Sequence, residues 1–260
     1  MDLTQTIVLA LVQGLTEFLP ISSSGHLVLT PVLLGWDDQG LAFDIAVHFG
    51  TLTAVVVYFR TELVTMARAM LSGRGPEARL GWQLIIATIP LGLAGLAFSD
   101  LVETLLRSPA VIAATSAGFG LLLWLADRYG RGQRPESGLR LSDAVWIGVG
   151  QALALIPGTS RSGITMTVAL ALGLSREAAG RFSFLLSIPA IAMVAAWQLV
   201  QLISDPAPVP WGGLALAAVL SSITAFLSIA AFLKLVGRVG MAPFAIYRIA
   251  LAGLIVVLLL

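Results

Sequence analysis

FLPISSSGHLVL, residues 18–29, places three consecutive serines, a glycine and a histidine after a proline. Apolar sequence lies on both sides of these polar residues, and Glu17 precedes them. A helix that crosses lipid does not need so many hydrogen-bonding side chains, because its backbone bonds are satisfied internally. These residues indicate that the chain turns here, that the polar groups line a site, or both.

The composition identifies an integral membrane protein. Of 260 residues, 58% are hydrophobic and only 11% are charged, whereas a soluble domain carries roughly 25% charged residues. The chain has no cysteine, which excludes disulfides, cysteine-ligated zinc and thiol catalysis. The formal charge of +1 says nothing about partners. We expect a single membrane domain over residues 1–260 that binds no nucleic acid.

Apolar segments of two lengths predict the layout. A membrane span needs about 20 apolar residues to cross roughly 30 Å of hydrocarbon. Segments 21–35 and 160–173 are too short, and each follows a proline-containing turn, LPISSSG (19–25) or PGTSRSG (157–163). We therefore predict an all-α membrane protein in which each turn joins two short limbs of a re-entrant helical hairpin. The six predicted full spans are 42–59, 82–98, 110–126, 182–203, 211–233 and 244–260.

Basic residues predict the orientation. Most of them fall in four loops on one face of this layout, and the positive-inside rule makes that face cytoplasmic. Both termini are then outside. The basic residues of these loops are Arg60, Arg68, Arg74, Arg79, Arg128, Arg131, Arg134, Arg140, Arg176, Arg181, Lys234 and Arg238. The opposite face carries Arg107 with Asp37, Asp38, Asp100, Glu103 and Asp205.

An internal repeat at an offset of 138 residues supports the same layout. Six positions align without gaps, so that repeat 1 covers about 1–130 and repeat 2 about 139–260. Because a hairpin and three spans make up each half, the second half is inverted, and the two turns are expected to meet near the midplane. The pairs are Gln13 with Gln151, Leu15 with Leu153, Ser22 with Ser160, Ser24 with Ser162, Gly25 with Gly163, and Gly35 with Gly173.

If the turns meet, their polar groups form one pocket. Gln13 and Glu17 are four residues apart, so they share a helix face and can offer two oxygens to one ligand. Arg161 supplies a planar fork of donors for phosphate or carboxylate, and His26 is a proton carrier near neutral pH. Serine hydroxyls and turn N–H groups are anion receptors. This pocket suits binding or hydrolysis of a phosphorylated lipid. The phosphate-binding candidates are Ser22, Ser24, Gly25, Thr159, Ser160, Ser162 and Gly163.

A structural interpretation of the same residues stays open. Glu17 and Arg161 can serve only to hold two hairpins together, and serines in membrane helices often cap ends or allow close packing. Nothing in the sequence ties Asp44 and His48 to the turns. Arg248 is expected to snorkel or to pair with another group.

Two motifs identify a family resemblance. QGLTEFLPISSSGHL (13–27) together with PGTSRSG (157–163) resembles the undecaprenyl-diphosphate phosphatases of the bacitracin-resistance type, and FDIAVHFGT (43–51) and RFSFLLSIP (181–189) extend the likeness over the whole chain. The resemblance implies hydrolysis of undecaprenyl diphosphate at the outer face of the bacterial plasma membrane, which recycles the lipid carrier of cell-wall synthesis. It also implies a divalent cation, Mg²⁺ or Ca²⁺, and leaves a homodimer open.

The resemblance also assigns roles to single residues. It implies that Glu17, Ser23, His26 and Arg161 are catalytic, and that Gln13 and Glu17 are associated with the metal. Gln13 stands where many members have glutamate, which lowers the charge of the site. Ser23 and His26 are three apart, so they share a face if the limb turns helical immediately after the proline. Two mechanisms stay open: attack by Ser23 with His26 as base, or attack by a water that His26 activates.

Two other functions use the same pocket. A transporter or flippase for polyprenyl-phosphate lipids would bind the headgroup there, and an ion-coupled transporter would bind a small anion. Architecture alone does not separate these from an enzyme.

Overall fold

The computed structural model describes residues 2–106, 108–130, 132–204 and 211–260. Arg107, Arg131 and Asp205 lie outside these residues, and the side chains of Asp100 and Glu103 are not described either. Within the described ranges the regular structure is helical, with one isolated bridge between Arg134 and Leu174. This confirms the all-α prediction.

The helices account for the apolar pattern of the chain. Six of them, α3, α5, α6, α9, α10 and α11, are long and apolar enough to cross a membrane, which confirms the six predicted spans. The sequence prediction does not include α4, an arginine-bearing and largely exposed helix. The elements are α1 (Leu3–Thr16), α2 (Ser23–Leu34), α3 (Leu41–Tyr58), α4 (Arg60–Ser72), α5 (Pro76–Leu105), α6 (Pro109–Tyr129), η1 (Glu136–Gly138), α7 (Leu141–Ala152), η2 (Leu153–Leu155), α8 (Arg161–Ala171), α9 (Arg176–Ser204), α10 (Trp211–Val239) and α11 (Ala242–Leu259).

Two pairs of shorter helices, α1–α2 and α7–α8, flank the polar turns. We call residues 17–22 turn 1 and residues 156–160 turn 2. Helix resumes after Ser22 in turn 1 and after Ser160 in turn 2, and these serines have φ angles of 73° and 68°. A non-glycine residue with positive φ is uncommon. Such a conformation costs about 1–3 kcal/mol and persists only where its surroundings determine it.

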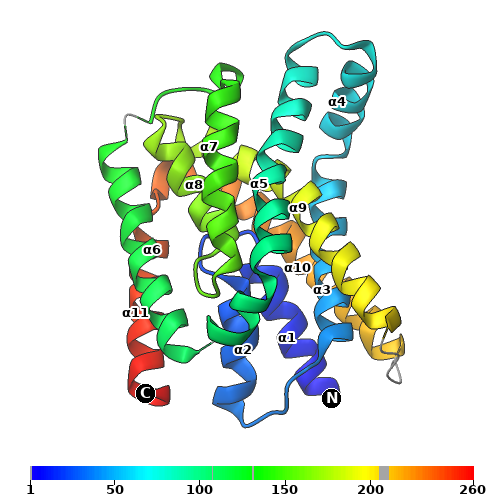
Figure 1. The fold of residues 1–260 in the computed structure, drawn as a ribbon, viewed down its shortest axis with the longest axis vertical. Coiled ribbons are helices and arrows are strands. Elements are labelled where there is room, and N and C mark those ends of the chain that lie inside the picture. Colours follow the sequence, from blue (N-terminus) through cyan, green and yellow to red (C-terminus); the bar gives the residue numbers. More distant parts are fainter. Residues whose placement is uncertain (1, 107, 131, 205–210) are drawn as a thin grey trace.

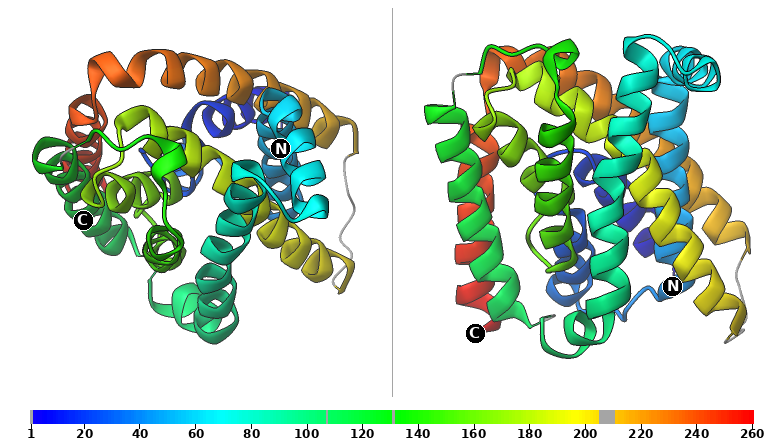
Figure 2. Two further views of the ribbon diagram at one scale, coloured as in Figure 1. Left: turned by 90° about the horizontal axis from the view of Figure 1, so that it is seen from above. Right: turned by 45° about the horizontal axis from the view of Figure 1, so that its top comes forward.

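The two turns come together in the middle of the molecule. Figure 1 shows α1 and α2 in its lower half and α7 and α8 in its upper half, with their turns facing each other between the long helices. Both termini lie at one end of the structure, and α4 lies at the other (Figures 1 and 2). A direct contact joins turn 1 to the start of α8, because the hydroxyl of Ser162 donates to the carbonyl oxygen of Leu19 at 2.9 Å.

Close helix packing fixes the depth of α1. A Cβ added to Gly14 in α1 would lie 2.5 Å from the carbonyl oxygen of Ser221 in α10, and a Cβ on Gly50 in α3 would meet the Ser221 hydroxyl. Glycines of this kind allow membrane helices to approach closely. Because α1 and α3 both pack on α10 at Ser221, the position of α1 along α10 is fixed, and with it the position of turn 1.

An aromatic cluster holds turn 1 in the core. Phe18, next to Glu17, is fully buried and packs edge-on against Phe184 of α9, with ring centroids 5.3 Å apart. Phe184 in turn packs against Phe232 of α10 at 5.2 Å. These rings place the backbone of Glu17 inside the bundle, away from lipid.

Candidate active site

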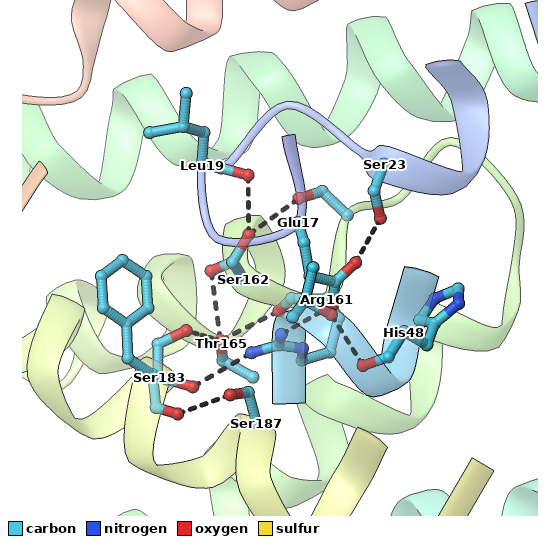
Figure 3. Close-up of polar contacts among 12 residues, drawn as sticks. Glu17, Leu19, Ser23, His48, Arg161, Ser162, Thr165, Ser183 and Ser187 are labelled. Carbon is cyan, nitrogen blue, oxygen red and sulfur yellow. Dashed lines mark hydrogen bonds and ion pairs between the residues drawn. The ribbon is translucent and has the colours of Figure 1, made fainter. Parts of the chain in front are cut away.

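Glu17 is the centre of the site. It caps the C-terminal end of α1, where its backbone N–H donates to Gln13 at 3.0 Å. Its Oε1 accepts from Nη2 of Arg161 at 3.0 Å, and its Oε2 accepts from the Ser23 hydroxyl at 2.6 Å (Figure 3). Nε2 of Gln13 also donates to Oε2, at 3.1 Å. One buried carboxylate thus connects both turns.

Arg161 is the first residue of α8 and faces turn 1. Its side chain is 13% exposed and that of Glu17 is 7% exposed, so this ion pair lies largely out of water. Nη1 of Arg161 donates to the carbonyl oxygen of Ser183 in α9 at 3.1 Å. The two ends of the guanidinium are therefore held by different helices, and the planar fork has a fixed orientation.

The serines of the two turns have matching contacts. The hydroxyls of Ser22 and Ser24 lie 3.3 Å apart, and those of Ser160 and Ser162 lie 3.2 Å apart. Ser22 of turn 1 is buried, whereas Ser24 of α2 is exposed. The hydroxyl of Ser160 accepts from the backbone N–H of Gly163 at 3.1 Å. The predicted phosphate-binding serines are thus gathered around one junction.

The remaining predicted phosphate-binding residues lie beside these serines. Gly25 is buried in the first turn of α2, and a Cβ there would lie 3.5 Å from the hydroxyl oxygen of Ser22. Thr159 in turn 2 is fully buried, and its hydroxyl oxygen has no hydrogen-bond partner among the described residues.

His26 is held away from Ser23. Its Nδ1 lies 2.7 Å from the carbonyl oxygen of Ser22, and its Nε2 lies 2.5 Å from the Tyr247 hydroxyl. A carbonyl oxygen only accepts, so Nδ1 carries the hydrogen and Nε2 accepts from Tyr247. The two rings are also stacked, with centroids 5.6 Å apart. Within the described chain no hydrogen bond joins Ser23 to His26; Ser23 donates to Glu17 instead.

His48 is a site neighbour that the sequence does not reveal. Its imidazole lies close enough to Glu17 for electrostatic interaction with the carboxylate. In Figure 3 His48 and Ser23 lie on the same side of Glu17 and Arg161. Its Nδ1 lies 2.7 Å from the carbonyl oxygen of Asp44. Helix α3 brings it to the turns by tertiary packing, which no local sequence pattern predicts.

Arg248 departs from the sequence expectation. It is 0% exposed, so it does not snorkel. No ion pair joins it to an acidic side chain in the part of the chain that the structure describes. All of its described hydrogen bonds go to backbone carbonyl oxygens. Sequence reasoning gives no sign of this arrangement, because α11 begins 220 residues after Ser22.

Gln13 and Glu17 fit a hard divalent cation. Oε1 of Gln13 is buried, and no described residue donates a hydrogen bond to it. Nε2 of the same side chain donates a hydrogen bond to the Glu17 carboxylate. Mg²⁺ and Ca²⁺ prefer oxygen ligands of this kind. Within the described ranges no group of three or more His, Cys, Asp or Glu side chains gathers as a metal site.

Comparison with known proteins shows the family of the chain. Residues 6–254 match the family described as Bacitracin resistance protein BacA. "Undecaprenyl-diphosphatase 2" of Stutzerimonas stutzeri is 54% identical, with 99% of this chain and 98% of the relative covered. "Undecaprenyl-diphosphatase" of Thioalkalivibrio sulfidiphilus is 53% identical, with 99% of each chain covered. A relative of the same name from Teredinibacter turnerae is 54% identical, with 98% of each chain covered. The chain belongs to the BacA family of bacitracin resistance proteins.

Proposed function

We propose that this protein hydrolyses undecaprenyl diphosphate to undecaprenyl phosphate and inorganic phosphate. The observation that carries the proposal is the buried Glu17 carboxylate, shared between the hydroxyl of Ser23 and the guanidinium of Arg161. A nucleophile, a base and a phosphate-binding cation are then in direct contact. The names of the relatives supply the substrate and favour hydrolysis over lipid transport.

Ser23 is the proposed nucleophile. Its Oγ forms a bond to the terminal phosphorus while the bond from phosphorus to the bridging oxygen breaks, and undecaprenyl phosphate leaves. The proton of Ser23 passes to Oε2 of Glu17, which already accepts it at 2.6 Å. Water then attacks the phosphorus of the phosphoserine. One proton of this water passes to Oγ of Ser23 as the Oγ–P bond breaks. Glu17 gives its proton to the departing phosphate, so the enzyme is restored.

The other residues bind and orient phosphate. Arg161 stabilises charge that develops on the transferred phosphoryl group, and the turn hydroxyls and N–H groups bind its oxygens. Gln13 and Glu17 would hold the divalent cation, which supplies neutralisation of phosphate charge when bound. In the competing mechanism His26 activates a water that attacks phosphorus directly, and Ser23 only orients the phosphate.

We propose that α1–α2 and α7–α8 are re-entrant hairpins of an inverted repeat. The offset of 138 residues supports this, because it relates the starts of α2 and α8 and the positive-φ serines Ser22 and Ser160. Gly35 and Gly173, the glycines after these helices, also share positive φ angles, of 67° and 87°. Repeat 1 then covers about 1–130 and repeat 2 about 139–260.

The proposed orientation places the termini and the mouth of the site outside the cell. The end of the molecule with α4 carries the arginine-rich loops, and the termini lie at the opposite end (Figure 1). Ser24 and Tyr247 are exposed, and both belong to helices that reach toward the terminal end. By the positive-inside rule the site opens to the outer face of the bacterial plasma membrane. A homodimer stays a prediction.

Phosphate release by purified protein tests the function. In detergent with undecaprenyl diphosphate and Mg²⁺ or Ca²⁺, the wild type releases inorganic phosphate and a chelator stops it. Glu17→Gln lowers turnover by roughly a thousandfold, because it removes the base and the anionic metal ligand. Glu77→Gln is the matched control, since Glu77 is exposed at the start of α5. A wild-type protein that moves polyprenyl phosphate across vesicles without releasing phosphate would be a transporter.

A further inference from the structure

Arg248 is a buried cation whose described partners are all carbonyl oxygens. Nε donates to Ser116 at 3.2 Å, and Nη1 donates to Pro20 at 3.4 Å. Nη2 donates to Thr115, Gly158 and Thr159 at 3.4, 3.0 and 2.8 Å. A charge inside a membrane protein usually pairs with another charge or with backbone carbonyls, and it often marks a functional site. Here one guanidinium joins turn 1, turn 2 and helix α6.

The acceptors lie next to the two strained serines. Pro20 precedes Ser22 by two residues, and Gly158 and Thr159 directly precede Ser160. Ser22 and Ser160 have positive φ angles of 73° and 68°, and strained backbone of this kind persists only where its surroundings determine it. Arg248 binds the backbone on the N-terminal side of both serines, and so it restrains both turns at once.

The surrounding glycines leave room for this side chain. A Cβ on Gly163 would lie 2.6 Å from Nη1 of Arg248, and a Cβ on Gly120 in α6 would lie 3.0 Å from its Cβ. Thr115, one turn of α6 before this point, also binds turn 2, because its hydroxyl donates to the carbonyl oxygen of Pro157 at 2.6 Å. The α6–α11 pair therefore contacts turn 2 through both a cation and a neutral hydroxyl.

We propose that Arg248, with Thr115 beside it, is a positioning residue for the phosphate turns. It fixes the backbone of turn 1, which leads into Ser23, and of turn 2, which leads into Arg161. It acts by holding this geometry and does not bind substrate. This inference rests on the proposed phosphatase function. It assigns to α11 a part in the reaction that neither sequence motif contains.

Lysine and glutamine at position 248 test the proposal. Lysine keeps the charge but presents a single ammonium, which cannot span the carbonyls of three segments; glutamine keeps an amide donor without charge. Both variants should lose kcat by about a hundredfold, because small misplacement of reacting groups has effects of that size. KM for undecaprenyl diphosphate should stay within about threefold of the wild type, since ground-state binding is retained. Wild-type kcat in Arg248→Lys, or a defect confined to KM, would overturn the positioning role.

Thr115→Val covers the case in which Arg248 variants fail to fold. Valine matches threonine in shape and leaves every charge in place, but it removes the hydroxyl bond to Pro157. We expect a loss of kcat of about tenfold with unchanged KM; unchanged kcat would contradict the proposal.

Arg134→Lys is the matched control. Arg134 also donates to backbone carbonyl oxygens, those of Leu172 and Gly138, but it pairs with Asp143 and lies outside the two turns. This variant should lose thermal stability and keep kcat. If the wild type releases no phosphate, the proposed function fails; if it does and the Arg248 variants match it, only the positioning role fails.

Discussion

The hydroxyl oxygen of Ser23 lies 2.6 Å from Oε2 of Glu17. Bonds between a hydroxyl and a carboxylate at about 2.5–2.7 Å are charge-assisted and stronger than neutral ones. The other oxygen of the same carboxylate accepts from Arg161 at 3.0 Å. The hydroxyl proton of Ser23, the proposed nucleophile, is therefore directed at the Glu17 carboxylate before substrate binds. The Arg161 guanidinium, proposed to stabilise phosphate, contacts the other oxygen of that carboxylate.

Arg161→Lys tests the orientation of that cation. Arg161 donates from Nη2 to Glu17 and from Nη1 to the carbonyl oxygen of Ser183. Lysine keeps the charge but loses the planar pair of donors, so we expect turnover to fall about a hundredfold in a protein that still inserts and folds. Phosphate release measures the effect, with the exposed Arg68→Lys of α4 as control. Near-normal turnover would show that charge alone suffices.

Gln13→Glu tests the metal site. Nε2 of Gln13 donates to Glu17 at 3.1 Å, and an ionised glutamate there would place two carboxylates side by side. Two such groups repel unless a cation lies between them. We expect the variant to keep its turnover in the presence of divalent cation and to bind the cation more tightly than the wild type. When a chelator is added, the thermal stability of the variant should fall further than that of the wild type. An identical response to cation and chelator in both proteins would remove Gln13 from the metal site.

Tyr247→Phe tests the role of the His26 contact. Phenylalanine keeps the stacked ring but removes the hydroxyl that donates to Nε2 of His26 at 2.5 Å. In the competing mechanism, in which His26 activates a water, the variant should lose turnover by roughly tenfold, a fraction of the loss in His26→Ala. Phosphate release across a range of pH measures both variants. Wild-type turnover in Tyr247→Phe would show that the hydrogen bond between Tyr247 and His26 has no part in the reaction.

Epitope tags test the orientation. The termini lie at one end of the molecule, and Arg74 follows α4 at the other end. We expect a tag at either terminus to be accessible from outside intact cells, and a tag at Arg74 to be protected until the membrane is permeabilised. Accessibility of the tag at Arg74 in intact cells would reverse the orientation.

The sequence predicts the parts of this site that depend on local pattern. Apolar length predicts the six spans, and the two proline–serine turns predict where the helices break. The 138-residue offset predicts that the two turns meet, and in the structure Arg161 donates to Glu17 at 3.0 Å. Contacts that depend on the rotation of distant helices have no local signal, which is why the bonds of Tyr247 to His26 and of Arg248 to both turns are absent from the prediction.

Side-chain direction within the first turn of α2 is also decided by tertiary contacts. Ser23 and His26 are three residues apart, so a shared face is a reasonable prediction from spacing alone. In the structure Glu17 binds Ser23, while Tyr247 and the carbonyl oxygen of Ser22 bind His26. The base that contacts Ser23 is therefore the carboxylate of Glu17. The sequence spacing of Ser23 and His26 does not reveal this contact.

The stereochemistry of the reaction at phosphorus tests the central claim, that Ser23 held on Glu17 attacks the terminal phosphate. The substrate is a polyprenyl diphosphate whose terminal phosphorus carries sulfur and two heavy oxygen isotopes in one known configuration, hydrolysed in ordinary water. A phosphoserine intermediate requires two in-line displacements, so the released thiophosphate should retain the configuration. Direct attack by water is a single displacement, and net inversion would contradict the account.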